Sequence, residues 1–280
     1  MNSPHSASYR PPSTAAAPRF RTPDQRRRLS RAFRTGALAY DAARPGYPEQ
    51  VYDLLHRHLA PLPSPQIVDV GAGTGKLTCG LEQRGNRVVA VEPSADMARV
   101  LSTRHGLPAV MGRAEALPLA ASALDAAAFA QTWHWVDPQL AGAELDRVLR
   151  PRGVVLLVWN TLDVADPWVL RLSRIMHSGD VLAEGFFPRT ATPWEVADTW
   201  RGRWADPLAA QDLFALAATR SYWLRSGPKD RARLRGNLEW YLYEHSGLNP
   251  EDEVALPYRT DAFVLTRRHQ PDARRTARLN

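Results

Sequence analysis

The chain has 280 residues, 44% of them hydrophobic, which suits one large globular domain or one domain with an elaboration. No apolar run approaches the ~18–20 residues that cross a bilayer, and the first 20 residues lack the apolar core of a secretory signal. A single cysteine, Cys79, excludes an internal disulfide and a metal site built from several cysteines. We therefore expect a cytoplasmic protein that has no membrane partner and holds no metal.

The net charge of +7 is concentrated near one end of the sequence. Residues 1–35 carry eight arginines and one acid, Asp24, so the remainder is about neutral. A basic segment can bind nucleic acid, direct a protein to an organelle or simply be solvated. The chain has 34 arginines and two lysines, a ratio typical of a GC-rich genome, so we favour a solvated segment over a nucleic-acid partner. We predict disordered tails over residues 1–28 and 269–280.

Between residues 47 and 160 the apolar positions alternate between helical and strand spacing. Strands that alternate with helices in units of ~30 residues are typical of a parallel, doubly wound sheet. Such a sheet binds ligands at the carboxyl ends of its strands. The predicted helices are 47–60, 75–85, 93–106 and 137–153, and the predicted strands are 66–70, 86–92, 108–111, 123–131 and 154–160.

The alternation stops after residue 160. Residues 161–210 are rich in tryptophan, and we expect them to form a helical insertion that caps the substrate. The alternation then resumes with a strand over 213–224, a helix over 229–247 and a last strand over 255–268. The tryptophans of the insertion favour an apolar or aromatic substrate pocket, although structural tryptophans would give the same pattern. They are Trp168, Trp194, Trp200 and Trp204.

Residues 68–78, VDVGAGTGKLT, form a glycine-rich loop between a buried strand and a helix, a setting that binds nucleotides. A P-loop requires glycine where Val70 stands and serine or threonine where Leu77 stands. The dinucleotide fingerprint requires a third glycine where Lys76 stands. What remains is an acid, Asp69, followed by three glycines at alternate positions. ATP or GTP hydrolysis is therefore not expected, and a nicotinamide dehydrogenase is a weaker alternative.

This loop resembles motif I of the class I S-adenosylmethionine-dependent methyltransferases. The segments VVAVEPSADM, GRAEALPLAASALDAAAFAQTWHWVD and RVLRPRGVVLLVWN are similar to later motifs of that family. AYDAARPGYPEQVYDLL and HWVD are similar to its small-molecule branch, which includes trans-aconitate methyltransferase. The resemblance covers roughly residues 35–160, with weaker similarity over 214–268. It implies a Rossmann-like α/β sheet of seven strands, mostly parallel with the last strand antiparallel, formed by residues 29–160 and 211–268.

The resemblance also implies a site for S-adenosylmethionine. Asp69 is expected to contact the amino group of the methionine part, usually through a water molecule. Glu92 is expected to bind the two vicinal ribose hydroxyls, since a carboxylate accepts two hydrogen bonds side by side. Glu115 is expected to face the adenine ring. The expected cofactor residues are Tyr40, Arg44, Asp69, Gly71, Ala72, Gly73, Glu92, Pro93, Met97, Ala114, Glu115 and Gln131.

Several of these residues keep a structural alternative. Met97 is equally suited to the core, Glu115 to capping the next turn, and Arg44 to a surface turn. The resemblance suggests that the segment with Tyr40, Arg44 and Tyr47 folds over the cofactor as a lid. In that case the guanidinium of Arg44 is suited to a carboxylate of the cofactor or the substrate.

The segment QTWHWVD should lie beside the transferred methyl group by the geometry of the family. His134 is a candidate base for a hydroxyl acceptor, and an oriented core histidine is the alternative. Trp133 and Trp135, with His134, are candidates for substrate binding, although at least one tryptophan suits the core. We expect a small organic acceptor, a carboxylate or a hydroxyl, and S-adenosylhomocysteine as product. A cofactor-binding scaffold without turnover is the alternative, and the sequence leaves the acceptor and the choice of monomer or homodimer open.

Overall fold

The computed structural model describes residues 12–15, 36–59, 62–178 and 182–268. Most of the two predicted disordered tails lies outside these residues. The chain divides into two compact units, and strands β6 and β7 have residues in both. Of the described residues, the motif unit contains 36–59, 62–159, 189–201 and 260–268, and the helical unit contains 12–15, 160–178, 182–188 and 202–259.

Seven strands form one sheet in the order β3-β2-β1-β4-β5-β7-β6. The pairs β1–β2, β2–β3, β1–β4 and β4–β5 are parallel, and the last strand is antiparallel, which confirms the predicted fold class. The order reverses between β1 and β4, so the carboxyl ends of these two strands mark the expected ligand site. The strands are β1 Gln66–Val70, β2 Arg87–Glu92, β3 Ala109–Met111, β4 Leu124–Ala130, β5 Leu149–Leu162, β6 Trp194–Ala209 and β7 Glu253–Arg267.

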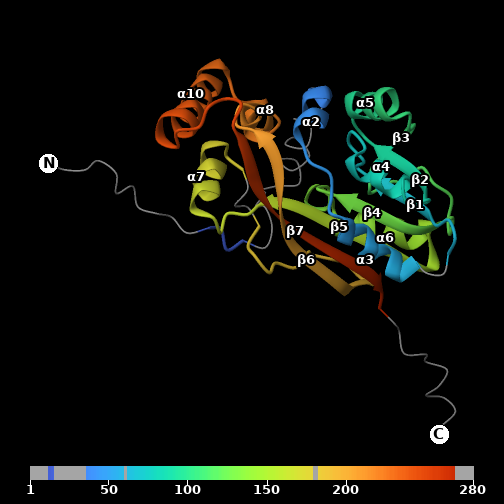
Figure 1. Cartoon of the computed structure of the whole chain (residues 1–280). Helices are drawn as coiled ribbons and strands as arrows, with labels where there is room; N and C mark the ends of the chain where they lie inside the picture. Colours follow the sequence, from blue (N-terminus) through green and yellow to red (C-terminus); the bar gives the residue numbers. More distant parts are fainter. Residues whose placement is uncertain (1–11, 16–35, 60–61, 179–181, 269–280) are drawn as a thin grey trace, which may run out of the picture. The chain divides into compact units, whose positions relative to one another are not determined.

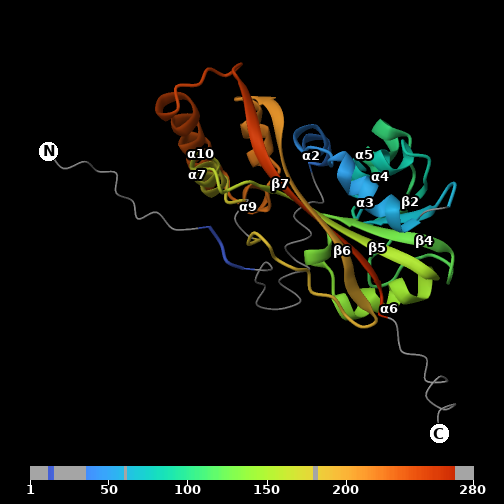
Figure 2. The ribbon, with the colours of Figure 1, turned by 60° about the horizontal axis from the view of Figure 1, so that its bottom comes forward.

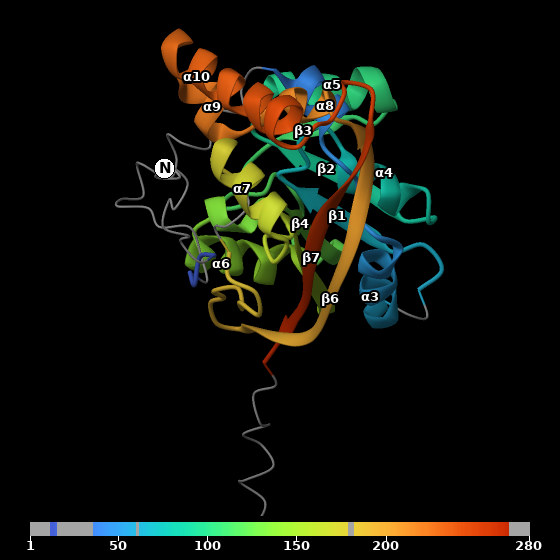
Figure 3. The ribbon, with the colours of Figure 1, turned by 60° about the vertical axis from the view of Figure 1, so that its left-hand side comes forward.

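Helices cover both faces of the sheet in the motif unit, with α3 and α4 on one face and α6 on the other (Figures 2 and 3). Every second residue of the strands, such as Ile67, Ala126 and Ala128, packs against the apolar side of α3 and α4. Both faces are covered, so the strands read as nearly continuous apolar runs. The helices of this unit are α2 Ala37–Ala43, α3 Glu49–Leu59, α4 Lys76–Glu82, α5 Ala95–His105, the 3-10 turn η2 Trp133–Trp135 and α6 Pro138–Val148.

The helix predicted over 137–153 is shorter in the structure. Asp137 caps α6 by accepting hydrogen bonds from the backbone N–H groups of Gln139 and Leu140, as its sequence suggests. The helix ends at Val148, and β5 begins at the next residue. Pro151 accounts for the early end, because a proline disfavours helical geometry at the residue before it and lacks the N–H that a helix requires.

The helical unit differs from two predictions. Residues 161–210 are not mainly helical, because α7 is the one α-helix among the described residues of this range and Trp194–Ala209 form strand β6. Residues 213–224 are not a strand but the helices α8 and α9. The helix predicted over 229–247 is α10 followed by a π-helical turn, η3. The helices are α7 Pro167–Ile175, α8 Asp212–Ala218, α9 Ser221–Arg225, α10 Pro228–Glu239 and η3 Trp240–His245.

The apolar spacing is ambiguous in the first segment, and in the second it is helical, which the predicted strand did not take into account. Trp200, Trp204 and Leu208 are four residues apart, a spacing that fits one face of a helix and one face of a strand equally well. In α8, Leu213, Leu216 and Ala217 are buried at helical spacing. Leucine and alanine also favour helices.

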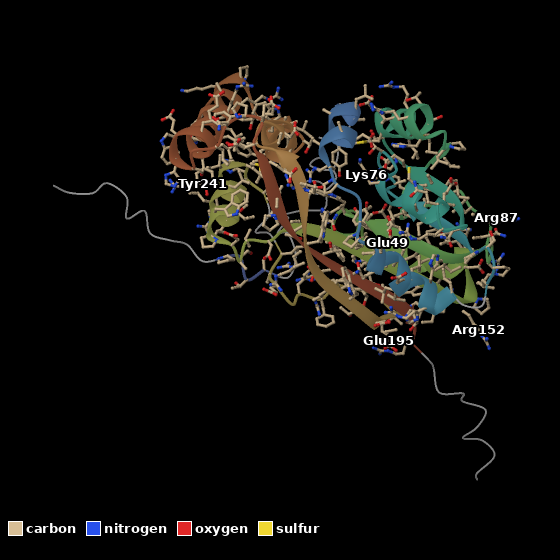
Figure 4. The ribbon with its side chains drawn as sticks, in the orientation of Figure 1. Glu49, Lys76, Arg87, Arg152, Glu195 and Tyr241 are labelled. Atoms are coloured by element: carbon tan, nitrogen blue, oxygen red, sulfur yellow. The ribbon has the colours of Figure 1, made fainter. Side chains whose placement is uncertain are left out.

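The core of the helical unit is rich in aromatic side chains. α7 lies beside α10 in Figure 1, and Tyr241 of η3 donates a 2.9 Å hydrogen bond to the carbonyl of Trp168 (Figure 4). The rings of Trp204 and Tyr258 stack with centroids 5.1 Å apart. Trp168 and Trp204 thus pack against this core. Trp194, in the motif unit, is buried, and its indole N–H donates a hydrogen bond to the carbonyl of Gly142. These three tryptophans have structural roles.

No helix within the described ranges combines the length and the hydrophobicity that a membrane span requires.

Candidate active site

The glycine loop joins the end of β1 to α4. Gly71, Gly73 and Gly75 all have left-handed φ angles, of 69°, 60° and 94°, which residues with a Cβ adopt at a cost. A Cβ on Gly71 would lie 2.5 Å from Cγ2 of Thr132, and one on Gly75 would collide with Leu101. A Cβ on Gly73 would meet nothing within 4 Å. Gly71 and Gly75 are therefore required by packing as well as by φ, whereas Gly73 borders open space.

Asp69 is completely buried beneath this loop. Its Oδ2 accepts a 2.7 Å hydrogen bond from Oγ1 of Thr78, and its Oδ1 has no hydrogen-bond partner among the described residues. Burial raises the pKa of Asp69 to about 7; the hydrogen bond from Thr78 opposes the rise, and the nearby charge of Glu92 adds to it. A buried carboxylate with one unused oxygen is suited to a cationic hydrogen-bond donor.

Glu92 ends β2 and is also buried. Its Oε2 accepts a 2.9 Å hydrogen bond from the N–H of Gly73, and its Oε1 accepts a 2.8 Å bond from the N–H of Ser94. Burial raises the pKa of Glu92, and these two bonds oppose the shift. Since each carboxylate oxygen can accept a second hydrogen bond, the two N–H groups orient Glu92 without using its full capacity.

The end of β4 is tied to the glycine loop. Gln131 has a left-handed φ of 55°, and its N–H donates a 2.9 Å hydrogen bond to the carbonyl of Val158. Oγ1 of Thr132 lies 2.9 Å from the carbonyl oxygen of Ala130 and 3.2 Å from that of Gly71. Sequence reasoning missed Thr132, although it adjoins the Trp-His-Trp segment. Strain at Gln131 is of the kind that collects at functional sites.

His134 lies in η2, directly after β4, and is held by Trp159 of β5. The indole Nε1 of Trp159 donates a 3.1 Å hydrogen bond to Nδ1 of His134. The ring of Trp135 lies 4.7 Å from the imidazole, centroid to centroid. Burial lowers the pKa of His134 to about 4. The base role stays a prediction, and this geometry favours the alternative of an oriented, neutral histidine.

Trp133 has the core role that the sequence left open as the alternative, and its contact with substrate stays a prediction. Its side chain is in the core, with 5% of its surface exposed. Its indole N–H donates a 2.8 Å hydrogen bond to the carbonyl of Arg189, and its ring packs edge-on against Phe129. Trp135 is half-buried and stays a candidate for substrate contact.

The expected adenine side of the site is partly structural. Oε1 of Glu115 accepts a 3.1 Å hydrogen bond from the N–H of Asp137 at the start of α6, and not from the next turn that the sequence suggested as its alternative. Ala114 is buried and Pro93 is exposed. Met97 belongs to a small core cluster that contacts Tyr40. The side chains of Glu115 and Met97 therefore have roles that need no ligand.

Helix α2 is anchored to α4 and α5 by Asp41, a residue that sequence reasoning missed. Asp41 is 6% exposed, and its carboxylate lies 3.7 Å from Nζ of Lys76 and 3.4 Å from Nε2 of His105. Figure 4 shows Lys76 at the start of α4. The guanidinium of Arg44 lies 5.1 Å from the centre of the Tyr40 ring. Lys76, which stands where the dinucleotide fingerprint has its third glycine, thus pairs with Asp41.

Burial raises the pKa of Tyr47 well above its ordinary value, and the charges of Tyr40 and Asp69 add to the shift. Tyr47, in the segment that follows α2, packs against the core cluster that includes Leu77 of α4, and the lid stays a prediction. The described residues contain no group of three or more histidines, cysteines or acids that could hold a metal ion.

Comparison with known proteins agrees with this geometry. The family described as "Methyltransferase domain" matches residues 68–157. An uncharacterized methyltransferase of Mycobacterium tuberculosis is 38% identical over 239 residues, which cover 84% of this chain and 95% of that protein. This chain belongs to the class I S-adenosylmethionine-dependent methyltransferases.

Two further comparisons have lower sequence identity. The malonyl-[acyl-carrier protein] O-methyltransferase of Herminiimonas arsenicoxydans is 34% identical to this methyltransferase over 131 residues, 46% of this chain and 50% of that protein. A solved protein of Anaeromyxobacter dehalogenans, described as a type II methyltransferase, is similar with a TM-score of 0.58 and 23% identity. That match covers 81% of this chain and 99% of the solved one, and it shows the shared fold. The similarity to trans-aconitate methyltransferase stays a prediction.

The residues of this methyltransferase fit S-adenosylmethionine, its cofactor. The unused Oδ1 of Asp69 is a suitable acceptor for an ammonium group, and Gly73 leaves room for a ligand beside the loop. A hydrogen bond from the N–H of Gly73 joins Glu92 to the glycine loop, and Asp69, at the end of β1, is joined to Thr78 of α4.

Proposed function

We propose that this methyltransferase transfers a methyl group to an oxygen of a small organic molecule, a carboxylate or a hydroxyl. Binding of S-adenosylmethionine is supported by Asp69, which is buried beneath the glycine loop and has one carboxylate oxygen without a hydrogen-bond partner among the described residues. Support for an oxygen acceptor comes from the similarity to the O-methyltransferase of H. arsenicoxydans.

When bound, S-adenosylmethionine would supply a methyl group on a sulfonium: the acceptor oxygen would form the new O–C bond as the C–S bond breaks, the electron pair would stay on sulfur, and the proton of a hydroxyl acceptor would pass to solvent. The residues of the chain then have to bind and orient the cofactor and the acceptor, and to exclude water from the site. Asp69 would accept from the ammonium group, and Glu92 would accept from the ribose hydroxyls with its remaining lone pairs. Tyr40 and Arg44 on and beside α2 would close over the cofactor.

Ligand-dependent thermal unfolding tests the cofactor site. S-adenosylhomocysteine at about 100 times its dissociation constant should stabilise the chain by about 2.7 kcal/mol, a shift of several degrees. Glu92→Gln should reduce this shift. Glu195→Gln is the matched control, because Glu195 is an exposed acid on β6 that pairs with Arg268 (Figure 4). A shift with NADH instead would contradict the proposal.

Methyl transfer from labelled S-adenosylmethionine to pooled carboxylic acids and pooled alcohols tests the acceptor. We expect label in one of these pools. Binding of S-adenosylhomocysteine without transfer to either pool would favour the non-catalytic scaffold instead.

A further inference from the structure

The environment of His134 bears on which acceptors the site can use. Trp159 follows Val158 on β5, and Val158 pairs with Ala130 at the end of β4. Trp159 is 3% exposed, and its ring packs edge-on against Phe263 with centroids 5.9 Å apart. Its indole N–H is therefore held in place by the sheet, beside the strand end that leads to His134.

The hydrogen bond between these residues fixes the proton on the imidazole. An indole nitrogen only donates, so Nδ1 of His134 accepts and carries no proton. Neutral His134 then has its proton on Nε2, on the other side of the ring. Nε2 makes no hydrogen bond to any described residue, and His134 is half-buried. His134 can therefore donate a hydrogen bond through Nε2, while the lone pair of its Nδ1 already accepts the bond from Trp159.

Electrostatics support this state. Burial is the one cause of the lowered pKa of His134, and no charged side chain of the described residues contributes to it. A base needs a free lone pair and a pKa near the working pH. His134 has neither in this arrangement.

We propose that Trp159 is a positioning residue that holds His134 neutral with its proton on Nε2, so that His134 donates a hydrogen bond to an anionic oxygen of the acceptor. This inference rests on the proposed function and narrows it. An oxygen that is already ionised has no proton to lose, so the reaction needs no base. The acceptor class is therefore a carboxylate or an acidic phenol rather than an alcohol.

Nitrogen NMR of the full chain labelled at histidine tests the proposal directly. The chain has eight histidines, and the signals that vanish in His134→Gln assign the ring. We expect an unprotonated Nδ1 and a protonated Nε2 that do not change between pH 8 and pH 5.5. In Trp159→Phe, Nδ1 loses its donor, so we expect a mixture of tautomers and titration at a higher pH.

Trp194→Phe is the matched control, because Trp194 is 4% exposed and its indole N–H donates a 3.0 Å hydrogen bond to the carbonyl of Gly142 instead. This variant should leave the His134 signals unchanged. A proton on Nδ1, or titration of wild-type His134 near pH 6.5, would overturn the proposal even if Trp159→Phe fails to fold. Binding of S-adenosylhomocysteine is measured separately, so loss of that binding would count against the proposed function and not against the His134 assignment.

Discussion

At the scale of single residues, Asp69 couples protonation to both stability and cofactor binding. Its pKa of about 7 in the folded chain is above the usual 3.8, so its contribution to stability is present at low pH and is lost as pH rises toward 7. An ammonium group beside Oδ1 favours the ionised form. Ligand binding should therefore expel the proton.

We predict that the dissociation constant of S-adenosylhomocysteine rises as pH falls from 8 to 6, by at most about tenfold per pH unit. Calorimetry in two buffers of different ionisation enthalpy measures the proton release. Asp69→Asn should bind the ligand more weakly and lose this pH dependence. The same variant should unfold at a higher temperature than wild type at pH 8, and its advantage should shrink as pH approaches 4. A dissociation constant that is constant from pH 8 to 6 would contradict the assignment.

Gly71 and Gly73 form a matched pair for testing the loop. Alanine at either position costs ~1–2 kcal/mol for its left-handed φ. At Gly71 the added methyl also meets Thr132 at 2.5 Å, and such overpacking costs a further ~1–3 kcal/mol. We therefore expect Gly71→Ala to be the less stable variant in chemical denaturation. Equal losses would mean that Thr132 moves aside freely.

At the scale of elements, α2 is held on the motif unit by few contacts. Ala37 packs on the cluster of Met97 and Val100, and the Asp41 carboxylate lies beside Lys76, Arg104 and the ring of His105. The N–H of Ala37 also donates a 3.1 Å hydrogen bond to Asp96. A short helix anchored in this way is suited to opening and closing.

We predict that Asp41→Asn loosens α2, at a cost of ~1 kcal/mol because its cationic partners Lys76 and Arg104 are partly exposed. Hydrogen exchange of residues 37–43 should become faster, and S-adenosylhomocysteine should bind a few-fold more weakly. Asp230→Asn is the control, since Asp230 pairs with Arg233 on an exposed face of α10. Unchanged exchange in Asp41→Asn would show that α2 does not depend on this carboxylate.

At the scale of the whole molecule, the charge is unevenly distributed along the sequence. Residues 1–28 carry six arginines and one aspartate, most of the net charge of the chain. We predict that deleting them leaves the affinity for S-adenosylhomocysteine unchanged. The full chain should bind duplex DNA no more tightly than the ~10⁻⁴–10⁻⁶ M typical of non-specific contacts. Titrations of both forms at 50 and 200 mM salt measure this, and tighter binding that the deletion abolishes would restore a nucleic-acid role.

The fold of the motif unit and the core of the cofactor site were predictable because their signals are local. The left-handed glycines after β1 and the acid at the end of β2 lie within one strand–helix–strand unit, where spacing fixes geometry. Glu92 accordingly reaches the glycine loop, where it accepts a hydrogen bond from the N–H of Gly73, while Asp69 accepts one from Thr78 of α4.

The tertiary structure alone decided the remaining features, because they join residues that spacing does not relate. Thr132 reaches Gly71 across 61 residues of sequence, and Trp159 fixes the proton of His134 across 25. Strand β6 could not be told from a helix, since its apolar residues fit both periods and only pairing in a sheet selects the strand. The sequence by itself thus determined the family and the cofactor. Long-range packing decided which donors and acceptors of the site remain available to a ligand, because a proton or lone pair that is already used within the fold cannot also bind a substrate.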